Sequence, residues 1–453
     1  MSDNIAKLRH AIHADYEAKT STSKALFERA KMSLPGGVSG NLRYFSPYPV
    51  YMRSGAGCLS TDIDGNEYVD CFSCNGPLLL GHRHPAVSRG QDQLTAVGSL
   101  VVNPEILVEC AELLKAAIPC AEKVRFLNSG TEAVMTAVRL ARGYSGKQKI
   151  VKFFGHYHGQ DDQFLLGVLP NRSTFGAGIP DQSISNTLTL PFNQIEPFEK
   201  LVRENDDIAA VILDPAMHSG GLWGADTEFL KAIRKITHER AIVLIFDEVI
   251  TGFRMGLGGA QAYHGVTPDL ATFGKALSAG EKLGAVVGKE WVMAVTDPLA
   301  PIGTPRVFQS GTGNDGTMAL AAAAGAIREY RRLEELGEYQ LLWNRVAGFE
   351  QAMRASFERH GIGVHINRLT SMMQLFMTRA QPTFEAYVEL DNSILDLFYL
   401  ALMSEGIMLS LPTSNHIYFS FMHDDEAIAS IVNAIDRVLE KYPFCEAIKQ
   451  IKI

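Results

Sequence analysis

Ala241-Ile-Val-Leu-Ile-Phe-Asp247 is an apolar run that ends in an acid, and a second run, Asp269-Leu-Ala-Thr-Phe-Gly-Lys275, ends in a lysine. We expect each run to form a buried strand with its charged residue at or just beyond the strand end. An acid and a lysine in these places can serve the two ends of one flat cofactor. Pyridoxal phosphate (PLP) needs such a pair, because a lysine amine holds its aldehyde as a Schiff base and a carboxylate keeps its ring nitrogen protonated. Asp247 and Lys275 therefore predict a PLP site.

Similar apolar runs alternate with helical stretches from about residue 120 onward. The runs cover residues 149–154, 208–213, 241–246 and 283–288, and helical stretches such as 132–144 and 227–240 separate them. Near-continuous apolar strands between helices indicate an α/β fold with a mostly parallel sheet covered on both faces. We expect a large PLP-binding domain over residues 76–340 and a small C-terminal α+β domain over residues 341–453. An N-terminal segment over residues 1–75 should contribute to the small domain and to the site.

The motif Phe246-Asp-Glu-Val-Ile-Thr-Gly-Phe-Arg254, with Pro268-Asp-Leu270 and Gly274-Lys275 after it, resembles the class III aminotransferases. Within that family it looks most like the glutamate-1-semialdehyde 2,1-aminomutase branch, and the resemblance runs from about Gly36 to His423. It implies PLP fold type I. It also implies a PLP-dependent aminotransferase that exchanges a Schiff base at Lys275 with an amino acid or related amine bearing an acidic group, with a 2-oxo acid as the second substrate.

The segment Asn128-Ser-Gly-Thr-Glu132 follows a strand-like run and precedes an amphipathic helix. Backbone N–H groups and hydroxyls at a helix N-terminus form an anion site. The alternative is an ordinary Ser or Thr helix cap. In the family this segment holds the PLP phosphate, which the resemblance carries over to Ser129, Gly130 and Thr131.

The segment His156-Tyr-His-Gly159 is similar to the family's Tyr-His-Gly segment, whose aromatic ring stacks on the pyridine ring. The resemblance therefore assigns Tyr157 to one face of the cofactor ring and Val249, two residues beyond Asp247, to the other. A metal site at His156 and His158 lacks a third nearby ligand.

The stretch Phe308-Gln-Ser-Gly-Thr-Gly-Asn314 corresponds to a family stretch in which a threonine reaches the phosphate of the neighbouring subunit. An alignment without gaps places the hydroxyl at Ser310, and an alignment on the Gly-Thr pair places it at Thr312. We prefer Ser310. Either alignment implies a homodimer with shared active sites.

Arg43 aligns with a family arginine that binds a substrate carboxylate, and a guanidinium matches a carboxylate bidentately. Around the expected substrate the chain departs from the family. Asn75, which we also assign to substrate binding, replaces an aromatic residue before a Gly-Pro turn. Asp214 replaces the glutamate of a Glu-Pro step, Glu281-Lys282 replaces a Leu-Pro step, and Asn415 replaces a glutamate typical of the aminomutases.

Other reactions begin in the same way on this scaffold. An aminomutase, a β-eliminating lyase and an epimerase all start with the substrate amine bound to PLP and the removal of a proton, so the shared residues do not separate them. A non-catalytic PLP-fold binding or regulatory domain is a further alternative. The presence of Lys275, Asp247 and Tyr157 together counts against it, because catalysis is what needs all three.

The composition of the 453 residues narrows the class of protein. A net charge of −8 argues against nucleic acid as the main partner. No apolar run is long enough to span a membrane, and the first residues lack a secretory signal, so we expect a cytoplasmic protein without a membrane partner. Cys71-Phe-Ser-Cys74 lacks a second pair at zinc-site spacing, so we expect no metal. Gly311-Thr-Gly-Asn-Asp-Gly316 matches a dinucleotide fingerprint, but no strand with an acid follows it.

Overall fold

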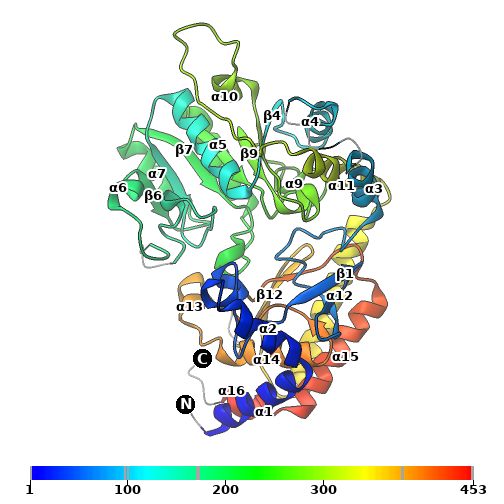
Figure 1. Ribbon diagram of the computed structural model, residues 1–453. Coiled ribbons are helices and arrows are strands. Elements are labelled where there is room, and N and C mark those ends of the chain that lie inside the picture. Colours follow the sequence, from blue (N-terminus) through cyan, green and yellow to red (C-terminus); the bar gives the residue numbers. More distant parts are fainter. Residues whose placement is uncertain (1–2, 96–97, 99–101, 170–173, 379–381, 450–453) are drawn as a thin grey trace. The chain divides into compact units, whose positions relative to one another are not determined.

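The computed structural model describes residues 3–95, 98, 102–169, 174–378 and 382–449 (Figure 1). The chain forms two compact units. One consists of Met1–His84 together with Gln340–Ile453, and the other of Pro85–Tyr339. Among the described residues, no helix combines the length and the hydrophobicity needed to cross a membrane.

A seven-stranded sheet lies at the centre of the Pro85–Tyr339 unit, in the order β4-β10-β9-β8-β7-β5-β6. The four pairs from β9 to β6 are parallel, whereas β10 runs antiparallel to both β4 and β9. The mostly parallel sheet predicted from the sequence is confirmed, with the run at 283–288 as its antiparallel member. The strands are β4 (Lys123–Leu127), β5 (Lys149–Phe153), β6 (Thr187–Leu190), β7 (Ile208–Leu213), β8 (Val243–Asp247), β9 (Leu270–Phe273) and β10 (Gly284–Gly288).

Helices of this unit such as α5 (Gly130–Ser145), α7 (Ile195–Glu204) and α8 (Thr227–Glu239) bury apolar side chains along one face. Helix α5 packs on β10, β9 and β7, where its Val134 and Val138 join a core with Ile212, Ile245 and Val286. Every residue of β7 and β8 is buried, which explains their continuous apolar sequences. The other helices are α3 (Pro85–Thr95), α4 (Glu105–Ala117), α6 (Asp181–Ile184), α9 (Gly259–His264), α10 (Glu290–Met293) and α11 (Thr317–Glu335).

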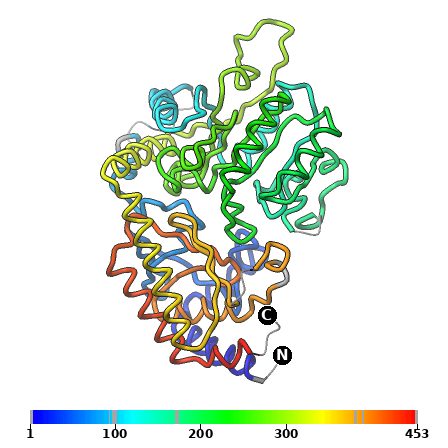
Figure 2. The backbone as a smooth tube through the Cα atoms, turned by 180° about the vertical axis from the view of Figure 1, so that it is seen from behind, coloured from blue at the N-terminus to red at the C-terminus, as the bar shows by residue number. Residues whose placement is uncertain are grey.

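Both ends of the chain build the other unit, which is the small α+β domain expected from the sequence. Figure 2 shows the first and last helices together in it, and α1 (Asp3–Lys19) contacts α14 (Ser393–Ser404) and α16 (Phe444–Ile448). Its two sheets have the orders β1-β2-β3-β13 and β11-β12-β14. The remaining elements are α2 (Ser21–Ala30), β1 (Met52–Ala56), β2 (Leu59–Asp62), β3 (Glu67–Asp70), α12 (Glu338–Arg359), β11 (His365–Leu369), β12 (Met372–Phe376), α13 (Phe384–Glu389), β13 (Ile407–Met408), β14 (Ile417–Tyr418) and α15 (Asp425–Lys441).

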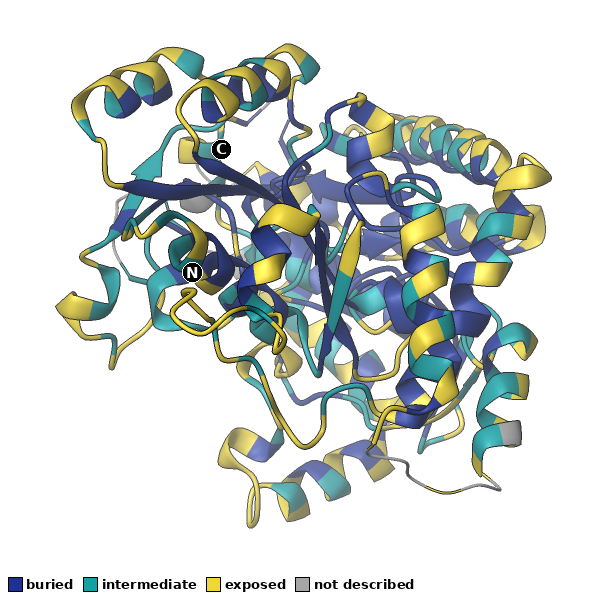
Figure 3. Ribbon diagram, turned by 90° about the horizontal axis from the view of Figure 1, so that it is seen from above, coloured by how far each residue is buried: buried dark blue, intermediate teal, exposed yellow. Residues whose placement is uncertain are grey.

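Burial follows this arrangement. Figure 3 shows largely buried strands, while many helices present an exposed face to the solvent. The carboxyl ends of parallel strands meet at one edge of a sheet, and ligands of open α/β sheets bind outside that edge. We therefore expect a ligand site at the edge of the sheet where β7, β8 and β9 end.

Candidate active site

A cavity of about 230 Å³ lies at this edge of the sheet. Asp247 is the last residue of β8, and Lys275 follows the end of the adjacent strand β9 by two residues, as the apolar runs predicted. Both side chains line the cavity. The full lining is Ser129, Gly130, Thr131, Val134, Tyr157, His158, Gly159, Asp214, Asp247, Val249, Ile250 and Lys275.

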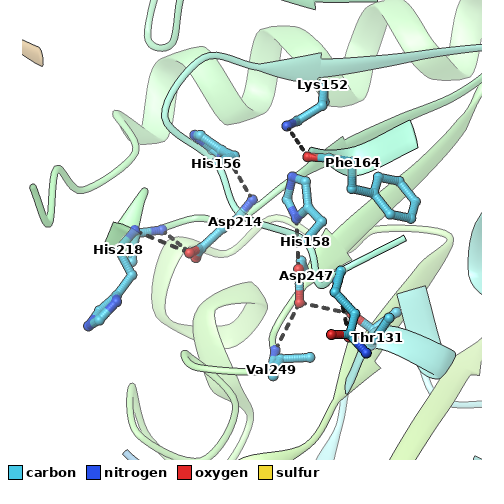
Figure 4. Close-up of polar contacts among 12 residues, drawn as sticks. Thr131, Lys152, His156, His158, Phe164, Asp214, His218, Asp247 and Val249 are labelled. Atoms are coloured by element: carbon cyan, nitrogen blue, oxygen red, sulfur yellow. Dashed lines mark hydrogen bonds and ion pairs between the residues drawn. The ribbon is translucent and has the colours of Figure 1, made fainter. Parts of the chain in front are cut away.

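The buried carboxylate of Asp247 is held by three hydrogen bonds. Its Oδ2 lies 2.7 Å from Nδ1 of His158, and its Oδ1 accepts from the hydroxyl of Thr272 at 3.0 Å and from the backbone N–H of Val249 at 3.1 Å. Figure 4 shows His158 and Asp247 pointing toward one another. These donors orient the carboxylate and stabilise its negative charge.

His158 has a role that the sequence does not reveal, because there this histidine suggests only a metal ligand. The imidazole is buried, and burial lowers its pKa while the bond to Asp247 opposes that shift. Within the described part of the chain, its Nε2 atom has no hydrogen-bond partner. Both observations favour a neutral imidazole that donates its Nδ1–H to Asp247. The only signal in the sequence was its place after the end of a parallel strand, at the same sheet edge as Asp247.

Lys275 sits in a left-handed backbone conformation, with φ of 44°, at the start of the 3₁₀ turn η5 (Lys275–Ser278). Burial lowers the pKa of its amine to about 8, although the charges of Asp247 and Asp214 oppose the shift. An amine with a lowered pKa spends more time neutral near pH 7, and only a neutral amine attacks an aldehyde.

The N-terminus of α5 forms one wall of the cavity. Ser129 is its N-cap, and the Ser129 hydroxyl accepts from the Glu132 N–H at 3.2 Å, which leaves the hydroxyl hydrogen available to an anion, so the phosphate role of Ser129 stays a prediction. Capping leaves the remaining N–H groups of the first turn and the positive end of the helix dipole for an anion. A Cβ added to Gly130 would lie 2.9 Å from both Cγ atoms of Val249, which explains glycine at this close approach.

Tyr157 and Val249, the two residues assigned to the faces of the ring, both line the cavity. Tyr157 is 42% exposed, so its ring is accessible to a ligand. Their roles as ring contacts stay a prediction.

In the sequence Asp214 is only a departure from the family, but in the structure it lines the cavity. It follows β7 and is 5% exposed. Its carboxyl accepts from the backbone N–H groups of Ala216 at 2.9 Å and His218 at 3.2 Å, and its own N–H donates to Nδ1 of His156 at 3.0 Å (Figure 4). Burial, aided by the charge of Asp247, raises the pKa of Asp214 to about 7.

Four predicted residues do not line this cavity. Ser310 and Thr312 are exposed in the segment before α11, which is joined to the end of β4 by a 2.9 Å hydrogen bond from Asn128 to Asn314. Arg43 and Asn75 belong to the other unit. There, Arg43 is exposed and donates to the Ser39 hydroxyl at 2.8 Å, and Asn75 accepts from the Tyr418 hydroxyl at 3.3 Å. Their roles stay predictions.

The cavity has the groups that PLP requires. Asp247 offers an oriented carboxylate for a protonated ring nitrogen, the first turn of α5 offers N–H groups for a phosphate, and Lys275 offers an amine of lowered pKa for the aldehyde. All three lie in one cavity, so the residues present fit this cofactor.

Known proteins support this assignment. The family model described as Aminotransferase class-III matches residues 43–439. A glutamate-1-semialdehyde 2,1-aminomutase of Chlorobaculum tepidum is 38% identical over 423 residues, which cover 91% of this chain and 96% of that protein. An omega-transaminase from Sphaerobacter thermophilus is similar in structure, with a TM-score of 0.85, 32% identity, and coverage of 92% and 97% of the two chains. A transaminase solved with PLP bound has the same TM-score and identity, with coverage of 93% and 98%.

Proposed function

The chain belongs to the class III aminotransferase family, and we propose that it is an aminotransferase acting on an amino acid or related amine that bears an acidic group. It is a PLP-dependent enzyme. The acidic group and the use of a 2-oxo acid as amino acceptor are part of the proposal.

The residues of the cavity have separate roles in such a reaction. When bound, PLP supplies an aldehyde for the substrate amine and a ring that accepts the electrons left behind by proton removal. Asp247, oriented by His158 and Thr272, keeps a proton on the ring nitrogen. Lys275 anchors the cofactor and, once displaced, takes the proton from the substrate carbon. The first turn of α5 binds the phosphate through its N–H groups.

We base the choice of reaction on Asn415, which stands where a glutamate is typical of the aminomutases. Asn415 is buried, and both the oxygen and the nitrogen of its amide form hydrogen bonds within the protein. The Oδ1 atom accepts from the Leu375 N–H at 3.2 Å and from the Tyr399 hydroxyl at 2.5 Å, while Nδ2 donates to the Leu375 carbonyl at 2.8 Å. An amide bonded in this way has no acid–base chemistry to offer a substrate, which supports transamination.

An aminomutase is the second candidate, because the curated relative of 38% identity carries that name. An aminomutase moves an amino group within one molecule and therefore needs no 2-oxo acid. A lyase and an epimerase remain alternatives on the same scaffold.

The acidic group of the substrate would bind Arg43. Its guanidinium is exposed, and the 2.8 Å bond to Ser39 engages one of its five N–H donors. A bidentate pair with a carboxylate uses two others, so the bond to Ser39 is compatible with this role.

The proposal includes a homodimer with shared sites. Ser310 and Thr312 are exposed in the single chain. This is expected of a hydroxyl that contacts the phosphate in a neighbouring subunit. Leu299, Ile302 and Phe308 in the same segment are at least 80% exposed, and grouped exposed apolar side chains mark interaction surfaces. The cytoplasmic location stays a prediction from the sequence.

The test follows the cofactor spectrum while single amines are added to the PLP-loaded enzyme without a 2-oxo acid. Transamination should stop after one turnover per site, with pyridoxamine phosphate accumulated, and should resume when a 2-oxo acid is added. Continuous formation of an isomer without a 2-oxo acid would establish the aminomutase. Continuous release of ammonia would establish the lyase.

A further inference from the structure

Two carboxylates lie side by side at the cavity, at the ends of neighbouring parallel strands. Leu213 of β7 pairs with Phe246 of β8, and the next residues along the two strands are Asp214 and Asp247. Neighbouring strands are about 4.8 Å apart, and residues in register point to the same face. Both residues line the cavity and both are only 5% exposed. The negative charge of Asp247 disfavours a second charge on the buried carboxyl of Asp214 and raises its pKa.

The hydrogen bonds of the two groups are unequal. Asp247 is bound by the His158 imidazole at 2.7 Å as well as by Thr272 and Val249, so its negative charge is stabilised by three donors. Asp214 receives two backbone N–H groups, the weaker at 3.2 Å. The ionised form is therefore better stabilised on Asp247.

The other ionisable groups around Asp214 do not make its ionised form more stable than that of Asp247. Nδ1 of His156 accepts the Asp214 N–H, so that atom carries no proton, and burial lowers the pKa of His156 well below its ordinary value. His218 follows in the turn η4 (His218–Gly220) and contributes its backbone N–H. The charge of Lys275 does favour an ionised Asp214, but burial and Asp247 outweigh it.

We propose that, at neutral pH and below, Asp214 carries a proton while Asp247 is ionised, so that the pair then bears one negative charge, located on Asp247. Asp214 is then a neutral acid that can donate a hydrogen bond into the cavity, and the charge facing the cofactor is not divided between two groups. Asp214 contacts no reacting atom in this role. By staying protonated it confines the negative charge to Asp247, whichever reaction the enzyme performs.

Infrared spectra of the PLP-loaded enzyme test this assignment, because a protonated carboxyl has its own C=O stretching band. The difference between wild type and Asp214→Asn should contain that band at low pH. The band should disappear as the pH rises through the Asp214 pKa, which burial raises to about 7. Asp269→Asn is the matched control, since Asp269 is also buried but pairs with Arg234 at 2.9 Å and should show no such band.

A second variant tests the pairing of the two carboxyl groups. Asp247→Asn removes the neighbouring charge, so the titration of the Asp214 band should move to lower pH. A missing band in the Asp214→Asn difference, or a titration that Asp247→Asn leaves unmoved, would overturn the proposal. The infrared band and its titration do not depend on turnover. They therefore test the protonation of Asp214 even if the enzyme is not a transaminase.

Discussion

Replacing Asp247 by Asn should slow proton removal from the substrate by roughly 100- to 1,000-fold, because an amide cannot keep the ring nitrogen protonated. The loss of one oriented electrostatic contact in an active site raises the barrier by about 2.7–4 kcal/mol. The folded state should suffer less. The amide oxygen can still accept from Thr272 and Val249, and His158 can change tautomer to accept from the amide N–H. The charge-assisted bond to His158 is lost, at about 1.5–3 kcal/mol.

Single-turnover kinetics with a substrate deuterated at the reacting carbon would measure this step directly, and thermal melting would follow the fold. Thr272→Val is the control, since it removes one neutral donor at 3.0 Å from the same carboxylate. A bond of that kind contributes about 0.5–1.5 kcal/mol, so the control should lose roughly tenfold or less. A near-normal rate in Asp247→Asn, or a loss no larger than that of Thr272→Val, would refute the role assigned to the carboxylate.

Four further predictions concern anchoring, assembly, recognition and pH. Lys275→Ala should purify without bound yellow cofactor, and borohydride reduction of the wild type should attach PLP to the peptide containing Lys275; attachment to another lysine would refute the assignment. Ser310→Ala should weaken PLP binding more than Thr312→Ala does in an equilibrium titration, and the reverse order would favour Thr312 as the phosphate ligand. Arg43→Ala should raise KM for acidic amines about tenfold to a hundredfold and spare neutral amines, whereas equal effects on both would contradict carboxylate binding. Burial lowers the pKa of Lys152 from 10.5 in the unfolded chain to about 7 in the folded protein. Between pH 7 and pH 10.5 the unfolded chain therefore binds more protons than the folded protein does. The free energy of unfolding should decrease as the pH falls through this range. Lys152→Met should remove that slope in urea unfolding curves, and an unchanged slope would show that the buried amine is not its source.

The strands, and the pair Asp247 and Lys275, could be predicted from the sequence because their signals are local. A strand covered on both faces must be apolar along its whole length, so β7 and β8 stand out as runs, and the charges at their ends stand out against them. Parallel neighbours end at one edge, which brings Asp247 and Lys275 to the same cavity. The direction of β10 could not be predicted, because Gly284–Gly288 is as apolar as the parallel strands β7 and β8, and hydrophobicity does not encode direction.

The sequence by itself determined the fold class, the family and the residues that suit PLP, because apolar periodicity and short motifs are local properties of the chain. Only the tertiary structure decided what surrounds those residues. The bond between His158 and Asp247 joins positions 89 apart, and the pairing of Asp214 with Asp247 depends on the register of β7 against β8. Register and burial arise from the packing of the whole unit, and they set which carboxyl is ionised and which imidazole is neutral.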